Sequence, residues 1–225
     1  MPGAAIGPSL DALRTDPRPG DPRSRHVAER PPLILASRSP YRRALLEQVR
    51  LPHEAIPADV DESRHPDEPA HDYVLRLARA KAEAVAERRP DALVIGSDQA
   101  AVLGERVLGK PGSEARAREQ LATASGQCVT FLTGVAVVHA AGGRRQSDVV
   151  PYRVHFRDLD ETTIARYVAL EQPLDCAGSF KSEGLGAVLF QRMEGSDPNA
   201  LIGLPLIRLF DFLLACGYPL IGSEE

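Results

Sequence analysis

Residues 33–43, Leu-Ile-Leu-Ala-Ser-Arg-Ser-Pro-Tyr-Arg-Arg, constrain the fold more than any other stretch of the chain. The run 33–36 is short and wholly apolar, as in a buried strand. Apolar residues at helical spacing follow it. Ser39 is suited to the N-cap of that helix, and Pro40 to its first turn. The segment therefore predicts a buried strand that runs almost directly into a helix.

Two cations follow at an unfavourable place, because Arg42 and Arg43 fall in the first helical turn. The exposed amides and the helix dipole favour anions there, so each cation costs about 0.3–1 kcal/mol. The hydroxyls of Ser37 and Ser39, the amides and the two guanidinium groups would together bind a polyphosphate. The alternative is that both arginines bend away to solvent or to surface carboxylates.

A second helix is predicted over residues 70–89, where apolar side chains recur at spacings of three and four. Lys81 falls on this apolar stripe. A lysine there usually lays its stem along the core and extends its amine to water. The other interpretation is that Lys81 brings a cation into a cleft.

Asp98 is the best candidate for an acid or base. It lies in Gly96-Ser97-Asp98-Gln99, between an apolar run at 92–95, predicted to be a strand, and a second apolar run at 100–103. A carboxylate between apolar runs is costly to bury unless it is paired or bound to a metal. The competing interpretation is a turn-forming aspartate after the strand. Beyond the Gly104-Glu105 turn, Lys110 would add a fixed cation at the end of a hairpin.

The remaining segments predict further elements. An acidic cluster at 59–63 caps a helix or faces water, or else it contributes a ligand to a divalent metal. Glycines between residues 176 and 189 indicate a bent strand or a backbone that a ligand approaches closely. The other predictions are a helix at 113–125 begun by Ser113, a β-hairpin arm at 128–156, a helix at 160–170, and a last helix at 205–215 packed in the core on most sides.

Composition limits the functional classes. A net charge of -4 argues against coating of nucleic acid and favours a small anionic ligand. Cys128, Cys176 and Cys216 are far apart and suggest neither a disulfide framework nor zinc, so we expect reduced thiols in the cytoplasm. No apolar run is long enough to span a membrane.

Residues 1–31 are rich in Pro, Arg, Asp and Gly and are predicted to be a disordered extension before one domain at 32–221.

Five short motifs occur in the order found in the Maf family of nucleoside triphosphate pyrophosphatases, and together they resemble that family over about residues 32–221. They are Ser37-Arg38-Ser39-Pro40-Tyr41-Arg42-Arg43, Val60-Asp61-Glu62, Gly96-Ser97-Asp98-Gln99, Gly109-Lys110-Pro111 and Lys181-Ser182-Glu183-Gly184. The resemblance implies an α/β fold with a mixed twisted sheet, flanking helices and two lobes around a deep cleft, like that of inosine triphosphate pyrophosphatases.

The resemblance also implies roles for individual residues. Asp98 would be the proton acceptor, and Glu62 with Asp98 would hold a divalent cation, Mg²⁺ or Mn²⁺. The triphosphate would be held by Ser37, Ser39, Arg42, Lys81 and Lys110. A homodimer would fit the family, and neither nucleic acid nor membrane is implied as a partner.

The combination of Gln99 and Glu183 resembles that of the subgroup of the Maf family that acts on 7-methyl-GTP. Methylation at N7 makes guanine cationic, so the Glu183 carboxylate could accept hydrogen bonds from the N1 and N2 edge and balance the charge. Tyr41 could offer its aromatic face to a cationic base. From the residues alone, Glu183 could equally be a surface carboxylate.

The expected reaction is hydrolysis between the α and β phosphates. It would give 7-methyl-GMP and pyrophosphate and remove a modified nucleotide from the pool. Two alternatives stay open: a pyrophosphatase for dTTP, UTP or CTP, and a non-catalytic nucleotide sensor that regulates cell division. The presence of Asp98 favours an enzyme, because binding of an anion gains nothing from an added negative charge.

Overall fold

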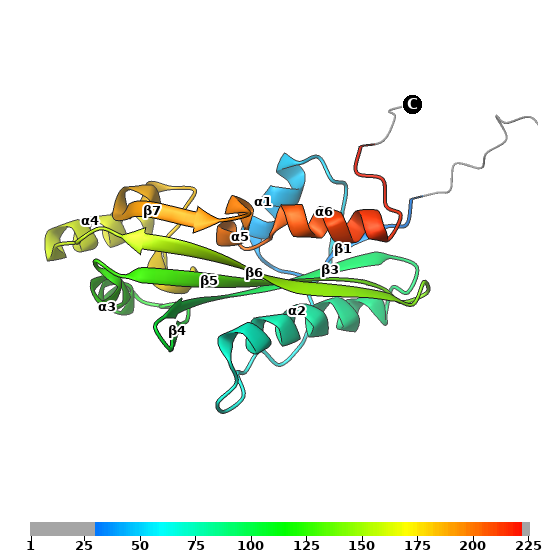
Figure 1. Cartoon of the computed structure of the whole chain (residues 1–225), viewed down its shortest axis with the longest axis horizontal. Helices are drawn as coiled ribbons and strands as arrows, with labels where there is room; N and C mark the ends of the chain where they lie inside the picture. The colour runs from blue at the N-terminus through cyan, green and yellow to red at the C-terminus, as the bar shows by residue number, and fades with distance from the viewer. Residues whose placement is uncertain (1–29, 222–225) are drawn as a thin grey trace, which may run out of the picture.

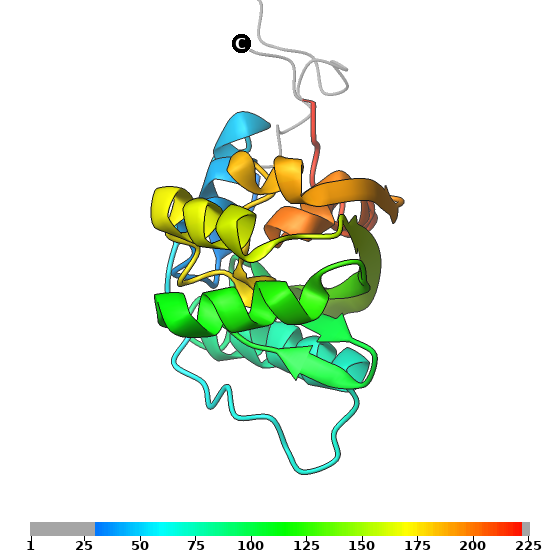
Figure 2. The ribbon, with the colours of Figure 1, turned by 90° about the vertical axis from the view of Figure 1, so that its left-hand side faces the viewer.

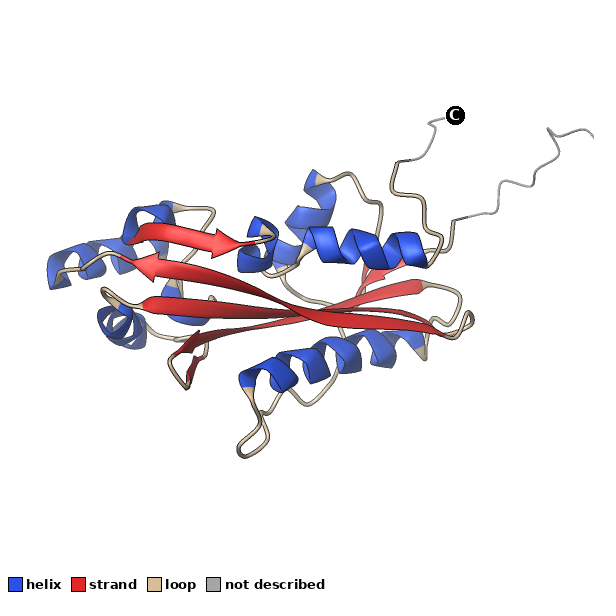
Figure 3. Cartoon of the chain, in the orientation of Figure 1, coloured by secondary structure: helices blue, strands red, loops and turns tan. Residues whose placement is uncertain are grey.

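The computed structural model describes residues 30–221, so the predicted extension at 1–31 lies almost wholly outside the described residues. One mixed sheet carries helices on both faces (Figure 1 and Figure 3). The elements are β1 (Leu33–Leu35), α1 (Pro40–Gln48), β2 (Glu54–Ala55), α2 (Ala70–Ala86), β3 (Leu93–Leu103), β4 (Arg106–Leu108), α3 (Glu114–Ala124), β5 (Cys128–His139), β6 (Arg144–Phe156), α4 (Glu161–Glu171), the 3-10 turns η2 (Ala177–Ser179) and η3 (Leu185–Leu189), β7 (Phe190–Gly195), α5 (Pro198–Ile202) and α6 (Leu206–Ala215).

The sheet order is β2-β1-β3-β5-β6-β7, with β4 paired to β3. Strands β1, β2 and β3 are parallel, and the remaining pairs are antiparallel. The predicted α/β class with a mixed sheet and flanking helices is therefore confirmed. The predicted β-hairpin at 128–156 is confirmed, because β5 and β6 pair antiparallel along their length. It is not a separate arm, since both strands belong to the main sheet.

The long strands join two regions with separate cores. At one end, α3 and α4 pack with the sheet around four edge-to-face phenylalanine rings, those of Phe131, Phe156, Phe180 and Phe190. At the other end, α1 and α6 cover one face of the sheet and α2 covers the opposite face (Figure 1). Viewed from the α3 and α4 end, a long loop between β2 and α2 hangs below the body (Figure 2). These two regions are the lobes that the resemblance implied.

The predicted helix caps are confirmed. Ser39 caps α1 and Ser113 caps α3, each by accepting a hydrogen bond from a backbone N–H in the first turn. Asp160 caps α4 in the same way, which was not predicted. Within residues 30–221 no helix is long and apolar enough to cross a membrane.

The predicted end of the strand at Ile95 is wrong. Strand β3 continues through Asp98 to Leu103, because β5 pairs with it along its length. The polar residues fit this strand because side chains alternate between its faces. Ser97 and Gln99 point to the α5 side, while Asp98 points to the α2 side. Asp98 is therefore a strand residue and not a turn residue.

Two further predictions need correction. Residues 176–189 form two 3-10 turns and not a bent strand, because Gly178 and Ser179 both have positive φ, of 75° and 62°. The last helix is not buried on most sides. Helix α6 lies on the sheet with one face outward, so Ile207 is 55% exposed and Leu214 57% exposed.

Helix α2 lies unusually close to the sheet because glycine faces it on two strands. A Cβ added to Gly96 would lie 2.1 Å from the carbonyl oxygen of Ala78, and one on Gly134 would lie 2.4 Å from that of Val74. Both obstacles are backbone atoms, which cannot rotate away as a side chain can. This approach sets the height of α2 above β3, and so the position of Lys81.

We therefore expect Gly96→Ala to lower the free energy of unfolding by about 1–3 kcal/mol or more, because α2 must move outward. Chemical denaturation of the full chain measures the change. Gly109→Ala is the matched control, since its added Cβ meets nothing within 4 Å. Equal stability of the Gly96 variant and the wild type would contradict the close approach.

Candidate active site

A cavity of about 680 Å³ opens between the two lobes. All of the predicted site residues except Arg43 line it, although they come from six different segments of the chain. These residues are Ser37, Ser39, Tyr41, Arg42, Glu62, Lys81, Asp98, Gln99, Lys110 and Glu183. The fold therefore brings these ten residues together.

The start of α1 forms one wall of the cavity and holds Arg42 in place. The hydroxyl of Ser37 accepts hydrogen bonds from Ser39 N (3.1 Å) and from Nη1 of Arg42 (3.3 Å). Nε of Arg42 donates to the carbonyl oxygen of Gly203 at 2.7 Å. Burial lowers the pKa of the Arg42 guanidinium, while the negative charges of Asp98 and Glu62 act to raise it. The arginine is thus a fixed cation directed into the cavity.

Arg43 does not contribute to this wall, so the predicted convergence of two guanidinium groups is wrong. Successive helical residues point about 100° apart, and Arg43 lines a separate surface hollow with Arg50 and His53. Arg38, which precedes the N-cap, lines the main cavity instead. The sequence analysis assigned no role to Arg38, which lies before the helix.

Lys81 lies at the centre of the charged cluster. Its Nζ is 2.7 Å from Oδ1 of Asp98 and 2.7 Å from Oε1 of Glu62. The lysine is only 7% exposed, so its amine does not extend to bulk water. Of the two interpretations of Lys81, the cation in a cleft is the one that the structure bears out.

Glu62 approaches Lys81 from the loop between β2 and α2. Burial acts to raise the pKa of the Glu62 carboxyl, but the hydrogen bond and charge of Lys81, with the charges of Lys110 and Arg42, lower it overall. The loop is tied to α2, because the Tyr73 hydroxyl donates to the Glu62 carbonyl oxygen at 3.0 Å.

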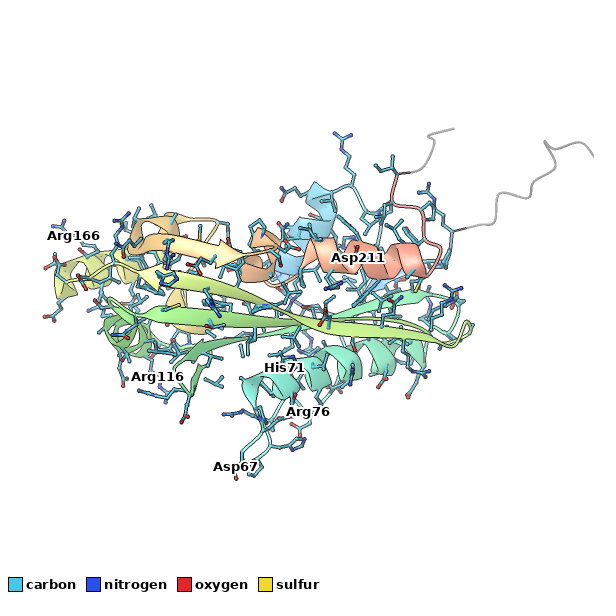
Figure 4. The ribbon with its side chains drawn as sticks, in the orientation of Figure 1. Asp67, His71, Arg76, Arg116, Arg166 and Asp211 are labelled. Carbon is cyan, nitrogen blue, oxygen red and sulfur yellow. The ribbon has the colours of Figure 1, made fainter. Side chains whose placement is uncertain are left out.

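Arg76 adds a second tie to the same loop. Its guanidinium forms a two-pronged ion pair with Glu68, at 2.7 and 2.8 Å, and also donates to the Ser63 carbonyl oxygen. Figure 4 shows Arg76 on α2 beside the loop that carries Asp67. Glu62 is therefore held by its backbone although its side chain is 59% exposed.

The amide of Gln99 is held in one orientation. Its Nε2 donates to the hydroxyl of Thr133 (3.0 Å) and to the carbonyl oxygens of Ala200 (2.7 Å) and Leu201 (3.1 Å). The Thr133 hydroxyl donates its own proton to the Ala200 carbonyl oxygen, at 2.8 Å. It is therefore the acceptor in its hydrogen bond with Gln99. A flipped amide would direct its oxygen at carbonyl oxygens, which is repulsive.

The other end of the same amide faces the cavity. Within the described part of the chain, no side-chain hydrogen bond reaches Oε1 of Gln99 and no buried polar side-chain atom lacks a partner. Oε1 is therefore accessible at the cavity wall. Gln99 presents a hydrogen-bond acceptor to any ligand there. Thr133, which helps to orient this amide, was not predicted as a site residue. The available signal was a threonine within the largely apolar run 129–138.

Tyr41 and Glu183 lie at the mouth. The Tyr41 hydroxyl donates to Oδ2 of Asp175, 3.4 Å away in the other lobe, and burial, followed by contact with Cys176, raises the pKa of Tyr41. Glu183 is exposed, and its Oε2 accepts a hydrogen bond from Ser182 at 3.2 Å. The lining of the cavity thus combines cations, hydrogen-bond acceptors and an aromatic ring.

Comparisons with known proteins show the family of the chain. The profile of a family described as Maf-like protein matches residues 32–216. A protein named 7-methyl-GTP pyrophosphatase from Pseudomonas fluorescens is 58% identical over 186 residues, covering 83% of this chain and 97% of that protein. Proteins of the same name from Pseudomonas aeruginosa and Alcanivorax borkumensis are 58% and 55% identical, covering 83% and 84% of this chain and 97% and 96% of theirs.

Among solved structures, the Ham1 protein of Staphylococcus aureus is similar with a TM-score of 0.42 and 16% identity, over 56% of this chain and 72% of that one.

Proposed function

The chain belongs to the Maf family, and from that premise we propose that it is a nucleoside triphosphate pyrophosphatase that acts on 7-methyl-GTP. It cleaves between the α and β phosphates and releases 7-methyl-GMP and pyrophosphate. One observation carries the proposal: three cations, Arg42, Lys81 and Lys110, line the same cavity as the buried Asp98. The names of relatives that are 55–58% identical over most of their length support the choice of nucleotide.

The triphosphate is bound by the hydroxyls and cations of the cavity wall. Ser37 and Ser39 lie at the start of α1, where the helix dipole favours anions. Arg42 has further N–H groups beyond the two that hold it to Ser37 and Gly203, and these donate to phosphate oxygens. Lys81 and Lys110 add two point charges, which stabilise the negative charge that builds on the leaving pyrophosphate.

Asp98 takes the proton of the attacking water. A carboxylate is a poor ligand for a triphosphate, so its presence beside three cations is explained by chemistry and not by affinity. Its Oδ1 is fixed by Lys81, which leaves its second oxygen as the proton acceptor.

The residues fit a divalent cation that arrives with the nucleotide. Mg²⁺ is usually held by one or two carboxylates together with phosphate oxygens and water. Glu62 and Asp98 supply two such carboxylates, and they are near one another because both contact the same Nζ. In the described range no larger group of His, Cys, Asp and Glu could hold a metal ion. When bound, Mg²⁺ or Mn²⁺ would neutralise charge on the phosphates.

The acceptor groups of the cavity favour a base with hydrogen-bond donors. Gln99 presents only its carbonyl oxygen, and Glu183 presents carboxylate oxygens. Guanine carries two adjacent donors on its N1 and N2 edge, whereas thymine and uracil carry a single N–H between two carbonyl acceptors. The positive charge of 7-methylguanine adds attraction to Glu183 and to the ring of Tyr41.

Glu183→Gln tests this assignment, because it removes the charge and keeps the size and one acceptor. The ratio of kcat/KM for 7-methyl-GTP to that for GTP should fall by about tenfold or more. Tyr41→Ala should act in the same direction but more weakly, because every base can stack on an aromatic ring. Equal slowing of all nucleotides by both variants would mean that neither residue recognises the base.

The choice of nucleotide is tested by pyrophosphate release from 7-methyl-GTP, GTP, UTP, CTP and dTTP at equal concentrations. We expect 7-methyl-GTP to have the highest kcat/KM. A preference for dTTP, UTP or CTP would show that the substrate is that nucleotide and not 7-methyl-GTP. Tight binding of 7-methyl-GTP without turnover in Mg²⁺ or Mn²⁺ would indicate a nucleotide sensor and not an enzyme.

We further propose the cytoplasm as the site of action, because a free nucleotide pool is found there. All three cysteines in the described range are unpaired, which suits a reducing compartment. A homodimer stays a prediction of the family resemblance.

A further inference from the structure

The loop that carries Glu183 is fastened to α4, outside the cavity. Lys181 begins the Lys-Ser-Glu-Gly motif, yet its Nζ donates to the carbonyl oxygen of Glu171 at 2.9 Å, in the last turn of α4. Its backbone N–H donates to the hydroxyl of Tyr167, a buried residue of the same helix, at 3.0 Å. Lys181 therefore binds the C-terminal end of α4 and is not positioned to bind phosphate.

The other end of the loop is held by a carboxylate. Oε2 of Glu171 accepts a hydrogen bond from the backbone N–H of Leu185 at 2.7 Å. A Cβ added to Gly184 would lie 2.7 Å from Oε1 of Glu171, so the loop backbone lies directly against this side chain. Hydrogen bonds to an ionised acceptor are about twice as strong as neutral ones.

The loop between these two anchors is compact. The N–H groups of Gly184 and Gly186 both donate to the carbonyl oxygen of Lys181, at 3.3 and 3.1 Å. A Cβ on Gly186 would lie 2.2 Å from that oxygen. With both ends fixed to α4 and the middle folded on itself, the loop has little freedom to shift along the cavity mouth.

Glu183 depends on this arrangement, because its side chain has little support of its own. Among the described residues, the Ser182 hydroxyl alone donates to its carboxylate. The position of the charge is thus set by the backbone beneath it. We propose that Glu171 is a positioning residue for base selection: it holds the 181–186 loop so that the Glu183 carboxylate faces the base. This inference rests on the proposed function, in which Glu183 recognises the methylated base.

The test uses two variants at one position. Glu171→Ala removes the acceptor for Leu185, whereas Glu171→Gln keeps one acceptor oxygen in the same place. Arg166→Ala is the matched control on the same helix. Arg166 lies at the outer end of the molecule (Figure 4), and it makes no hydrogen bond or ion pair with any other described residue through its side chain.

Glu171→Ala should lower the ratio of kcat/KM for 7-methyl-GTP to that for GTP by about threefold to tenfold, mainly through KM, because a shift of about 1 Å in a positioning group has effects of this order or larger. Turnover of GTP should change little, since Asp98 and the cations are untouched. Glu171→Gln should recover most of the ratio, and Arg166→Ala should leave it at the wild-type value. Thermal melting of each variant verifies folding.

A double-variant cycle separates positioning from a general structural defect. If Glu171 acts through Glu183, Glu171→Ala should change the ratio little once Glu183→Gln is present. Independent, additive losses would overturn the proposal, as would an equal slowing of both nucleotides by Glu171→Ala. If Glu183→Gln alone leaves the ratio unchanged, it is base recognition by Glu183 that fails. If only Glu171→Ala leaves it unchanged, positioning fails.

Hydrogen exchange tests the anchor without any nucleotide. The amide of Leu185 should exchange faster by about tenfold or more in Glu171→Ala, because its acceptor is gone, and should stay protected in Glu171→Gln and Arg166→Ala. Unchanged protection of Leu185 in Glu171→Ala would show that the carboxylate does not hold the loop.

Discussion

Asp98→Asn should lower kcat for 7-methyl-GTP by about 10²–10⁴-fold, the usual contribution of a positioned general base. Asparagine has the same shape and can still accept a hydrogen bond from Lys81 through its amide oxygen. It cannot accept the proton of a water molecule. KM should stay the same or fall, because the variant removes a negative charge from a cavity that binds an anion. Steady-state kinetics with saturating Mg²⁺ would measure both parameters.

The control for this variant is Asp91→Asn, an exposed aspartate just before the same strand β3. It should keep wild-type kcat. If Asp98 served only the fold, activity would instead decrease in proportion to the unfolded fraction. A folded Asp98→Asn protein with wild-type kcat would remove Asp98 from the mechanism.

Lys81→Met should have the second-largest effect, because one ammonium group holds both Asp98 and Glu62. Methionine is similar in length but leaves two carboxylates near each other without their shared cation. We expect a loss of about 2–4 kcal/mol in the free energy of unfolding, slightly below the usual cost of breaking a fully buried pair because Glu62 is partly exposed. kcat/KM should fall by about 10²-fold or more, because charge stabilisation on the phosphates is lost.

The same variant has a defined effect on pH dependence. Lys81 is the main group that lowers the pKa of Glu62, so its removal should raise that pKa. Glu62 would then become protonated at a higher pH, and the acid side of the activity profile should move upward. Arg79 lies on the exposed side of the same helix and donates a hydrogen bond to the Ser147 hydroxyl. Arg79→Ala should leave the pH profile unchanged. An unmoved acid side in Lys81→Met would contradict the pairing of Lys81 with Glu62.

The features that the sequence predicted best depend on neighbours in the chain. The cap at Ser39 and the helix that follows it require only local hydrogen bonds, and the stripe on α2 placed Lys81 on the buried side. The grouping of the site residues followed from the family motifs, each of which is a short continuous run of residues. Signals of this kind are contained within a few turns of helix or a few residues of strand.

The features that were missed depend on partners distant in sequence. Asp98 lies within a continuous strand only because β5 pairs alongside it, and no local pattern around 96–99 reports that partner. The orientation of the Gln99 amide is set by α5 carbonyl oxygens about one hundred residues away. The anchoring of the Glu183 loop by Glu171 likewise requires α4 to pack beside it. Periodicity carries no signal for such contacts.

The most direct test of the proposed reaction is hydrolysis of 7-methyl-GTP in oxygen-labelled water with Mg²⁺, with both products examined by mass spectrometry. If water attacks the α phosphorus within this cavity, the label should appear in 7-methyl-GMP, and the pyrophosphate should be unlabelled. Label in pyrophosphate would mean attack at the β phosphorus, and release of orthophosphate would mean attack at the γ phosphorus. Either result, or no turnover at all, would contradict the account.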